Sequence, residues 1–209
     1  MRVHFRHRIG VEGVEKILAV SILLHGKEAL NEDVSIDTTV QPKNITYPTD
    51  TKLAVKIIKQ CRKIAGQEEV ELRQSYKFVV KDLVQKANSK SQKQAQAKKK
   101  ARKKLKTIAN RLVRELKRKL NEESLAKQCE KLEIYERVLR QKKDDKDKIY
   151  SLHELEVGCI AKGKEHKKYE FGSKVAFATG QKSNVIKAAV SFKGNPNDNQ
   201  TVGKTLELV

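Results

Sequence analysis

Apolar and polar positions follow two different periods along this chain, and the first 66 residues already contain both. Apolar side chains at steps of three and four predict an amphipathic helix over about residues 10–25, with Gly26 as its stop. β-Branched residues at every second position then predict a short strand over 33–41 that is closed by Pro42. A second helical stripe predicts a helix over about residues 50–66.

The next segment has a helical pattern almost throughout, from Val70 to about Arg140. Three apolar stripes follow one another, and only the short polar run 121–124 separates the second stripe from the third. Two long helices joined by so short a turn are expected to pack as an antiparallel hairpin. Residues 89–97 are a low-complexity run of Lys, Gln, Ala and Ser, which we interpret as a flexible connection or a frayed helix.

The pattern changes again after a charged linker at 142–148. Two extended runs, 169–179 and 184–193, are separated by a four-residue turn that contains Gly180, which predicts a β-hairpin. A helix is expected to begin at Thr201. The predicted organisation is a leading helix, strand and helix over 1–66, an α-helical insertion over 67–148, and a β-hairpin with the start of a helix over 149–209.

Positive charge is concentrated in the helical insertion. The chain has 209 residues, with 46 Lys and Arg against 26 Asp and Glu, which gives a formal net charge of +20. Fourteen of the basic residues and one acid, Glu115, fall between Ser89 and Leu120. An ordinary charge run is a solvated helix face, but a stripe this dense attracts polyanions, and nucleic acid is the commonest of these in the cytosol. We expect its densest part to contact phosphate, through Lys98, Lys99, Lys100, Arg102, Lys103 and Lys104.

Several other classes of protein are excluded by what the sequence lacks. No stretch approaches the about 20 consecutive apolar residues of a membrane helix, and the basic start has no signal-peptide core. The expected location is the cytoplasm. The three cysteines are far apart and outside any CxxC pair, which argues against a zinc ribbon and against a disulfide framework. Glycine-rich nucleotide-binding motifs and the zinc-protease and serine-hydrolase signatures are absent too.

One carboxylate stands out in the predicted first strand. Asp37 lies in the middle of a short apolar run, where a buried carboxylate is costly unless it is paired or coordinates a metal ion. This favours a chemical role. The plainer interpretation is a strand-end Asp that hydrogen-bonds the following turn, which is the usual case for a lone Asp.

Four motifs of this sequence, taken in order, resemble one family of enzymes. They are residues 35–41 with 44–50, residues 149–154, residues 163–172 and residues 194–198. Together they closely resemble motifs of the DDE-type transposases of bacterial insertion sequences, in the group four/five families. The resemblance runs over essentially all 209 residues.

The resemblance implies an α/β architecture, a partial ribonuclease-H-like fold whose first strand carries the first acid of an Asp-Asp-Glu triad. Asp37 takes that position, as catalytic residue and as a ligand of Mg²⁺. Ser35 and Thr39 would share its strand face, and the apolar positions 34, 36 and 40 would face the core. The second Asp and the Glu would follow the last predicted helix. We therefore expect a truncated copy that is inactive alone, and whether the chain is an enzyme stays open.

The resemblance also implies a function and partners. The function is DNA transposition by Mg²⁺-dependent strand cleavage and transfer, and the partners are transposon ends and target DNA, in association with the nucleoid. A homodimer is compatible with it, whereas a membrane or a small-molecule substrate is not expected. Further phosphate contacts are expected from Lys164, His166, Lys167 and Lys168. Asp198 and Glu154 are possible substitutes for the missing acids, but nothing in the spacing places them beside Asp37. We expect Asp198 to cap a helix instead, and Glu154 has no assigned role.

Two alternatives stay open. A non-catalytic nucleic-acid-binding protein would use the same basic helical insertion, and the two functions differ in whether Asp37 and a divalent ion matter. The other alternative is a decayed gene product that folds poorly, because a β-hairpin without neighbouring strands is marginally stable.

Overall fold

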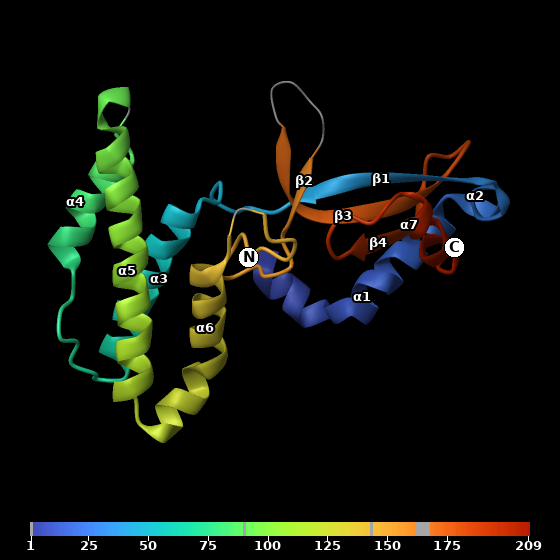
Figure 1. The fold of residues 1–209 in the computed structure, drawn as a ribbon. Coiled ribbons are helices and arrows are strands. Elements are labelled where there is room, and N and C mark those ends of the chain that lie inside the picture. Colours follow the sequence, from blue (N-terminus) through green and yellow to red (C-terminus); the bar gives the residue numbers. More distant parts are fainter. Residues whose placement is uncertain (1, 90, 143, 162–167) are drawn as a thin grey trace. The chain divides into compact units, whose positions relative to one another are not determined.

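The computed structural model describes residues 2–89, 91–142, 144–161 and 168–209. These residues form a mixed α/β structure with seven α-helices, one short 3-10 helix and an antiparallel sheet (Figure 1). The chain divides into two compact units, a sheet unit of residues 1–44 and 156–209 and a helical unit of residues 45–155. The sequence pattern suggested divisions near 66 and 148, but the helix after the first strand packs with the other helices. None of the helices in the described ranges has the apolar length that a bilayer crossing requires.

The sheet unit is built around one long central strand, β3 (Tyr169–Gly180). β1 (Val34–Pro42) lies antiparallel to it along one side. On its other side, β2 (Gly158–Ala161) pairs with the first residues of β3, and β4 (Ile186–Phe192) pairs with the remainder. The first strand and the β-hairpin predicted from the sequence are therefore confirmed, whereas β2 is an addition that the sequence pattern did not indicate.

Gly172 lies where β3 has a neighbouring strand on both sides. This residue is opposite Pro42 on β1 and opposite Gly158 on β2. A Cβ atom at Gly172 would overlap the carbonyl oxygen of Gln41, which is backbone and cannot move aside independently. A side chain at this position would force β1 away from β3.

The two faces of the sheet differ in what covers them. α7 (Asn199–Leu206) packs against β3 and β4. Ala176 and Ala178 of β3 and Thr201 and Thr205 of α7 are fully buried, because small side chains let the helix approach the sheet closely. From Val34 to Val40 of β1 the even positions are buried or half-buried and the odd positions are exposed. The predicted orientation of the first strand is confirmed, with the apolar side chains of Val34, Ile36 and Val40 on one face and Ser35, Asp37 and Thr39 on the other.

Two helices precede the sheet, α1 (Arg2–Leu24) and α2 (Gly26–Asn31). α1 begins well before residue 10, and a break at Gly10, where φ is 60°, divides it. α1 ends at Leu24, and Gly26, which has a φ of 84°, is the first residue of α2, so the predicted stop is followed by further helical residues. Glu32 then accepts hydrogen bonds from the backbone N–H groups of Lys182 and Ser183 at 2.8 and 3.0 Å, which holds the β3–β4 turn.

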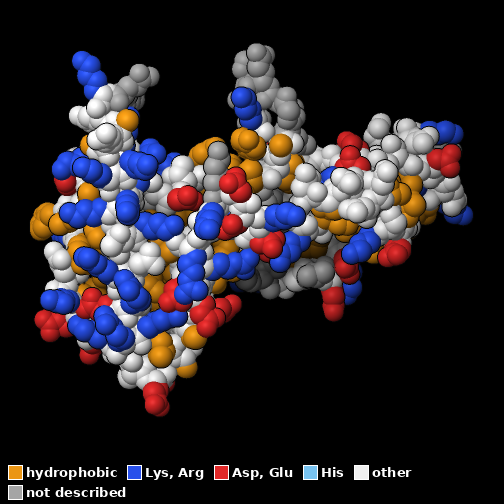
Figure 2. Space-filling model, viewed as in Figure 1, with side chains coloured by type: hydrophobic (Ala, Val, Ile, Leu, Met, Phe, Trp, Pro, Cys, Tyr) orange, Lys and Arg blue, Asp and Glu red, His pale blue; other side chains and the backbone are white. Residues whose placement is uncertain are grey.

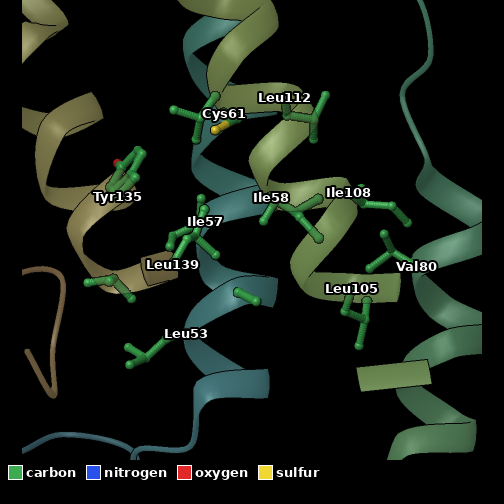
Figure 3. Close-up of a cluster of buried hydrophobic side chains, with 14 of the residues drawn as sticks. Leu53, Ile57, Ile58, Cys61, Val80, Leu105, Ile108, Leu112, Tyr135 and Leu139 are labelled. Carbon is green, nitrogen blue, oxygen red and sulfur yellow. The ribbon is translucent and has the colours of Figure 1, made fainter. Parts of the chain in front are cut away.

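The helical unit consists of α3 (Asp50–Gln67), α4 (Lys77–Ala87), α5 (Ala95–Lys119) and α6 (Glu122–Arg140), with a 3-10 turn (Gln92–Gln94) before α5. α5 contacts each of the other three helices and supplies the centre of the core. Figure 3 shows this cluster, in which leucine and isoleucine side chains of α3 and α5 interdigitate beside Cys61 and Tyr135. α5 and α6 run antiparallel, as predicted (Figure 1).

The helix starts in this unit follow ordinary capping chemistry. The Thr49 side chain accepts a hydrogen bond from the backbone N–H of Lys52, and the Asn121 side chain accepts one from Ser124. Residues 70–76 differ from the prediction because they are not helical. Tyr76, immediately before α4, has a φ of 55° and lies in the left-handed region, so a helix cannot continue through it.

Candidate nucleic-acid interface

α5 has one buried apolar side and a basic surface around the rest of its circumference. Twelve of its 25 residues are Lys or Arg, and one is acidic. Its apolar residues recur at steps of three and four and are buried against α3, α4 and α6. This periodicity confines the basic residues to the solvent side. Figure 2 shows Lys and Arg side chains gathered over α5.

The six phosphate contacts predicted from the sequence lie together on the first half of α5. Lys99, Lys100, Lys103 and Lys104 are exposed, and Lys98 is half-buried. Arg102 is exposed as well, but its guanidinium donates a hydrogen bond to the carbonyl oxygen of Ala87, at 3.4 Å, where α4 ends. A cation at a helix C-terminus is stabilising, so Arg102 also has a structural role.

The second half of α5 borders a hollow that the sequence analysis did not single out. It has a volume of about 840 Å³ and is open to solvent. α5 contributes three arginines to its lining, and the non-helical segment 70–76 contributes a fourth together with Tyr76. We call these four residues the arginine cluster: Arg73, Arg111, Arg114 and Arg118.

Acidic groups near the arginine cluster are already paired with lysines. The ammonium group of Lys117 lies 3.1 Å from a carboxylate oxygen of Glu136, and that of Lys119 lies 3.0 Å from Glu115. Burial by itself would raise the pKa of Glu115, but the Arg73 backbone N–H and the Lys119 ammonium outweigh it and hold this pKa below its ordinary value. Within the ranges that the structure describes, no acid forms an ion pair with any member of the arginine cluster.

Part of the arginine cluster could have been found from the sequence. Arg111, Arg114 and Arg118 are spaced by three and four residues, which places them on one side of a helix. Arg73 could not have been found in this way, because its segment carries a helical pattern. Its position depends on a long-range contact, in which its backbone N–H donates to Glu115 at 2.6 Å.

A second basic hollow lies between α3 and α6. Its volume is about 510 Å³, and its lining includes Lys56, Lys59 and Lys63 of α3 and Lys131 of α6. The spacing of the α3 lysines by three and four residues is visible in the sequence and places them on one side of that helix. The basic character of the helical unit is therefore not confined to α5.

Asp37 lies on the open face of the sheet rather than in a buried strand. Its side chain is exposed, and Oδ1 accepts a hydrogen bond from the backbone N–H of Thr38 at 2.8 Å. Phe177 of β3 is its directly opposite neighbour. The expected desolvation of this carboxylate is therefore wrong, because the strand is covered only on the side of its even-numbered residues.

Asp198 does not join Asp37. It accepts a hydrogen bond from the Thr38 hydroxyl at 2.7 Å and pairs with the largely buried Lys174 ammonium at 2.5 Å. Thr38 and Lys174 both belong to the covered face, which is opposite to the face that carries Asp37. The expectation of a helix cap is also wrong, since the Asp198 side chain caps no N–H group of α7. Its role is to join β1, β3 and the start of α7.

The magnesium site expected at Asp37 stays a prediction. Among the described residues, no three His, Cys, Asp or Glu side chains lie close enough together to hold a metal ion. A site for two such ions needs several carboxylates, and Asp37 alone cannot supply them. Of the other predicted phosphate contacts, Lys168 is exposed at the start of β3, while Lys164, His166 and Lys167 lie outside the described residues.

Comparisons with known proteins find a relative that matches part of the chain. No protein-family model matches the chain, and no solved structure matches it. An uncharacterized protein, ORF8 in the nfe locus of Rhizobium meliloti, is 40% identical over 89 residues. The match covers 40% of this chain and 42% of the length of that protein. The chain is thus similar to less than half of a relative whose name states no activity.

Proposed function

We propose that this chain is a DNA-binding protein of the insertion-sequence transposase type, and that its helical unit makes the main contacts with DNA. The observation that carries the proposal is the exposed basic surface of α5, on a helix whose opposite side is fixed in the core. A rigid row of cations loses little conformational freedom on binding, because the packed helix has already set its geometry.

The dimensions of α5 suit a duplex. A helix of 25 residues rises by about 37 Å, and one turn of B-DNA is about 34 Å long. The row of cations on the exposed side of α5 is therefore about as long as one turn of a DNA duplex. Lys and Arg contacts of this kind give affinity without sequence selectivity. We expect α5 to bind DNA of any sequence.

The topology of the sheet unit supports the transposase part of the proposal. β1, β3 and β4 form an antiparallel run with β3 in the middle, followed by α7. A ribonuclease-H-like domain of the kind expected from the sequence begins with this order of strands and a helix. Asp37 would be its first acid, on the face of β1 whose side chains are exposed.

A non-catalytic DNA-binding protein is the second candidate. It is favoured by the lack of any group of metal-binding side chains among the described residues. Both candidates bind DNA through α5, so they differ only in the role of Asp37. Incubating the purified 209-residue protein with supercoiled DNA and Mg²⁺ or Mn²⁺ tests whether Asp37 supports strand cleavage in this chain. We expect no nicking by this chain alone, and nicking that Asp37→Asn abolishes would favour an active enzyme.

The DNA-binding proposal is tested by removing the charge on the first half of α5. In a six-site variant, Lys98, Lys99, Lys100, Arg102, Lys103 and Lys104 are changed to Gln. A matched control removes six exposed charges elsewhere, at Lys131, Lys142, Lys146, Lys182, Lys193 and Lys204. Affinity for a fluorescent duplex at low salt should fall at least about tenfold further in the α5 variant than in the control. Equal losses would show that net charge alone, and not α5, attracts DNA.

A further inference from the structure

The arginine cluster differs in kind from the lysine-rich half of α5. Three of its members lie on one side of α5, and Arg73 reaches the same hollow from the segment 70–76. Four arginines therefore line one open space together with a single carboxylate, that of Glu115, which already pairs with the Lys119 ammonium. The remaining positive charge favours binding of an anion. Arg114 uses one N–H to contact the carbonyl oxygen of Asn110, at 3.3 Å. In the described structure, the side chains of Arg73, Arg111 and Arg118 make no hydrogen bond within the chain.

Arginine in this arrangement suits phosphate. A guanidinium presents N–H groups in a planar fork that binds two phosphate oxygens at once, whereas an ammonium acts as a point charge. Residues that serve only to keep a helix soluble need no such convergence. The lysines of the first half of α5 project from a single convex helix surface, whereas the arginine cluster lines a hollow formed by two segments.

Two features hold the hollow in shape. The bond from the Arg73 backbone N–H to Glu115, at 2.6 Å, ties the segment 70–76 to α5, and the Lys119 ammonium donates to the carbonyl oxygen of Glu71, at 2.6 Å. Tyr76, which lines the hollow, is held in a left-handed conformation that costs a tyrosine about 1–2 kcal/mol. Strained residues of this kind collect at ligand sites, where the surrounding structure keeps them in place.

We propose that Arg73, Arg111, Arg114 and Arg118 form a binding site for the phosphate groups of a bound DNA strand. In this arrangement the lysines of the first half of α5 attract the duplex, and the arginine cluster fixes the position of its backbone. The DNA part of this inference rests on the proposed function. The shared chemistry is phosphate, so a soluble oligophosphate is the other possible source of the ligand.

The test changes arginines of the cluster to lysine, which removes the planar guanidinium but keeps the positive charge. A cradle variant carries Arg111→Lys and Arg118→Lys, and a matched control carries Arg137→Lys and Arg140→Lys, two arginines of the same unit that lie on α6 outside the hollow. All four side chains are exposed, so both variants should fold, which thermal melting verifies. Duplex affinity is measured over a range of salt concentrations. We expect the cradle variant to lose about tenfold in affinity at an unchanged salt slope, because the charge is retained and the bidentate contacts are lost.

A second experiment determines whether the bound phosphate belongs to DNA or to a soluble anion. Binding of tripolyphosphate to the wild-type protein and to both variants is measured by titration calorimetry. If the cradle variant loses tripolyphosphate binding but keeps its DNA affinity, the site is a phosphate site for a soluble anion. If it matches the control in both measurements, the inference is overturned. This outcome is distinguishable from failure of the proposed function, in which the six-site Gln variant and its control would bind DNA equally.

Discussion

The Glu115 carboxylate accepts a hydrogen bond from the backbone N–H of Arg73 at 2.6 Å, across 42 positions of sequence. This contact, together with the ion pair to Lys119, fixes the segment 70–76 against α5. Replacing Glu115 by Ala should destabilise the protein by about 1–3 kcal/mol, because it leaves a partly buried N–H unpaired. Urea unfolding measures the loss. Glu123→Ala, at an exposed carboxylate of α6, is the control and should stay within about 0.5 kcal/mol.

Acid should destabilise the protein through three glutamates. Hydrogen bonds from Ser183 and Lys182 lower the pKa of Glu32. Hydrogen bonds from Ser124 and Gln128 lower the pKa of Glu68 in the same way. The pKa of Glu115 is lowered as well, although burial opposes this shift. A carboxyl whose pKa is depressed in the folded state stabilises that state above its unfolded value, here 4.5, and loses this contribution as the pH falls through the folded pKa. The urea midpoint should therefore be flat near neutral pH and decline below about pH 5.

The control for this pH dependence is the triple variant Glu32→Gln, Glu68→Gln and Glu115→Gln. It should be less stable than the wild type near neutral pH, and its decline in acid should be shallower. An equally steep decline in both proteins would assign the acid sensitivity to other groups.

Asp37→Asn should leave stability within about 0.5 kcal/mol of the wild type, because the side chain is exposed and its hydrogen-bond partner is the adjacent N–H. Asp198→Asn is the contrasting variant. It removes the charge that pairs with the largely buried Lys174 ammonium, so we expect a loss of about 1–3 kcal/mol. Thermal or urea unfolding of the two variants gives the comparison. A strongly destabilised Asp37→Asn would indicate a structural role for that residue.

The three cysteines should differ in reactivity. Cys61 is fully buried, and burial raises the pKa of its thiol to about 12. Cys129 is half-exposed, although a hydrogen bond to Glu133 raises its pKa as well. In a thiol titration of the native protein, Cys61 should react only on unfolding. The variant Cys61→Ala identifies the slow phase, and three thiols reacting at one rate would contradict the packing of α3 in the core.

The periodicity of apolar residues correctly predicted the buried face of a strand or helix wherever that element packs one side against a neighbour. The alternation in β1 correctly placed Val40 on the covered face, and the spacing of Leu105 and Leu112 correctly predicted the buried side of α5. Both follow from periods of two and 3.6 residues, which are properties of the backbone. The apolar stripes could also predict that α5 and α6 form a hairpin, because their connection is short.

Features that depend on long-range contacts could not be predicted in this way. The segment 70–76 has a helical pattern, yet Glu115 and the left-handed Tyr76 hold it in another conformation. Asp198 precedes a helix, which predicted a cap, but its side chain contacts Thr38 and Lys174 instead. Both of these residues belong to strands that are distant in the sequence. Three residues of the arginine cluster have helical spacing. The fourth, Arg73, lies 38 or more positions before the other three arginines in the sequence. Sequence spacing can identify the first three alone.

The central claim is that the helical unit binds DNA through backbone phosphates, and the dependence of duplex affinity on salt tests it most directly. Contacts with about six to ten phosphates predict a fall in affinity of about 10³–10⁵ between about 50 and about 200 mM salt. Few aromatic residues lie near α5, so base stacking should add little. The six-site Gln variant should show a markedly flatter slope. A wild-type affinity that is insensitive to salt, or an unchanged slope in that variant, would contradict the account.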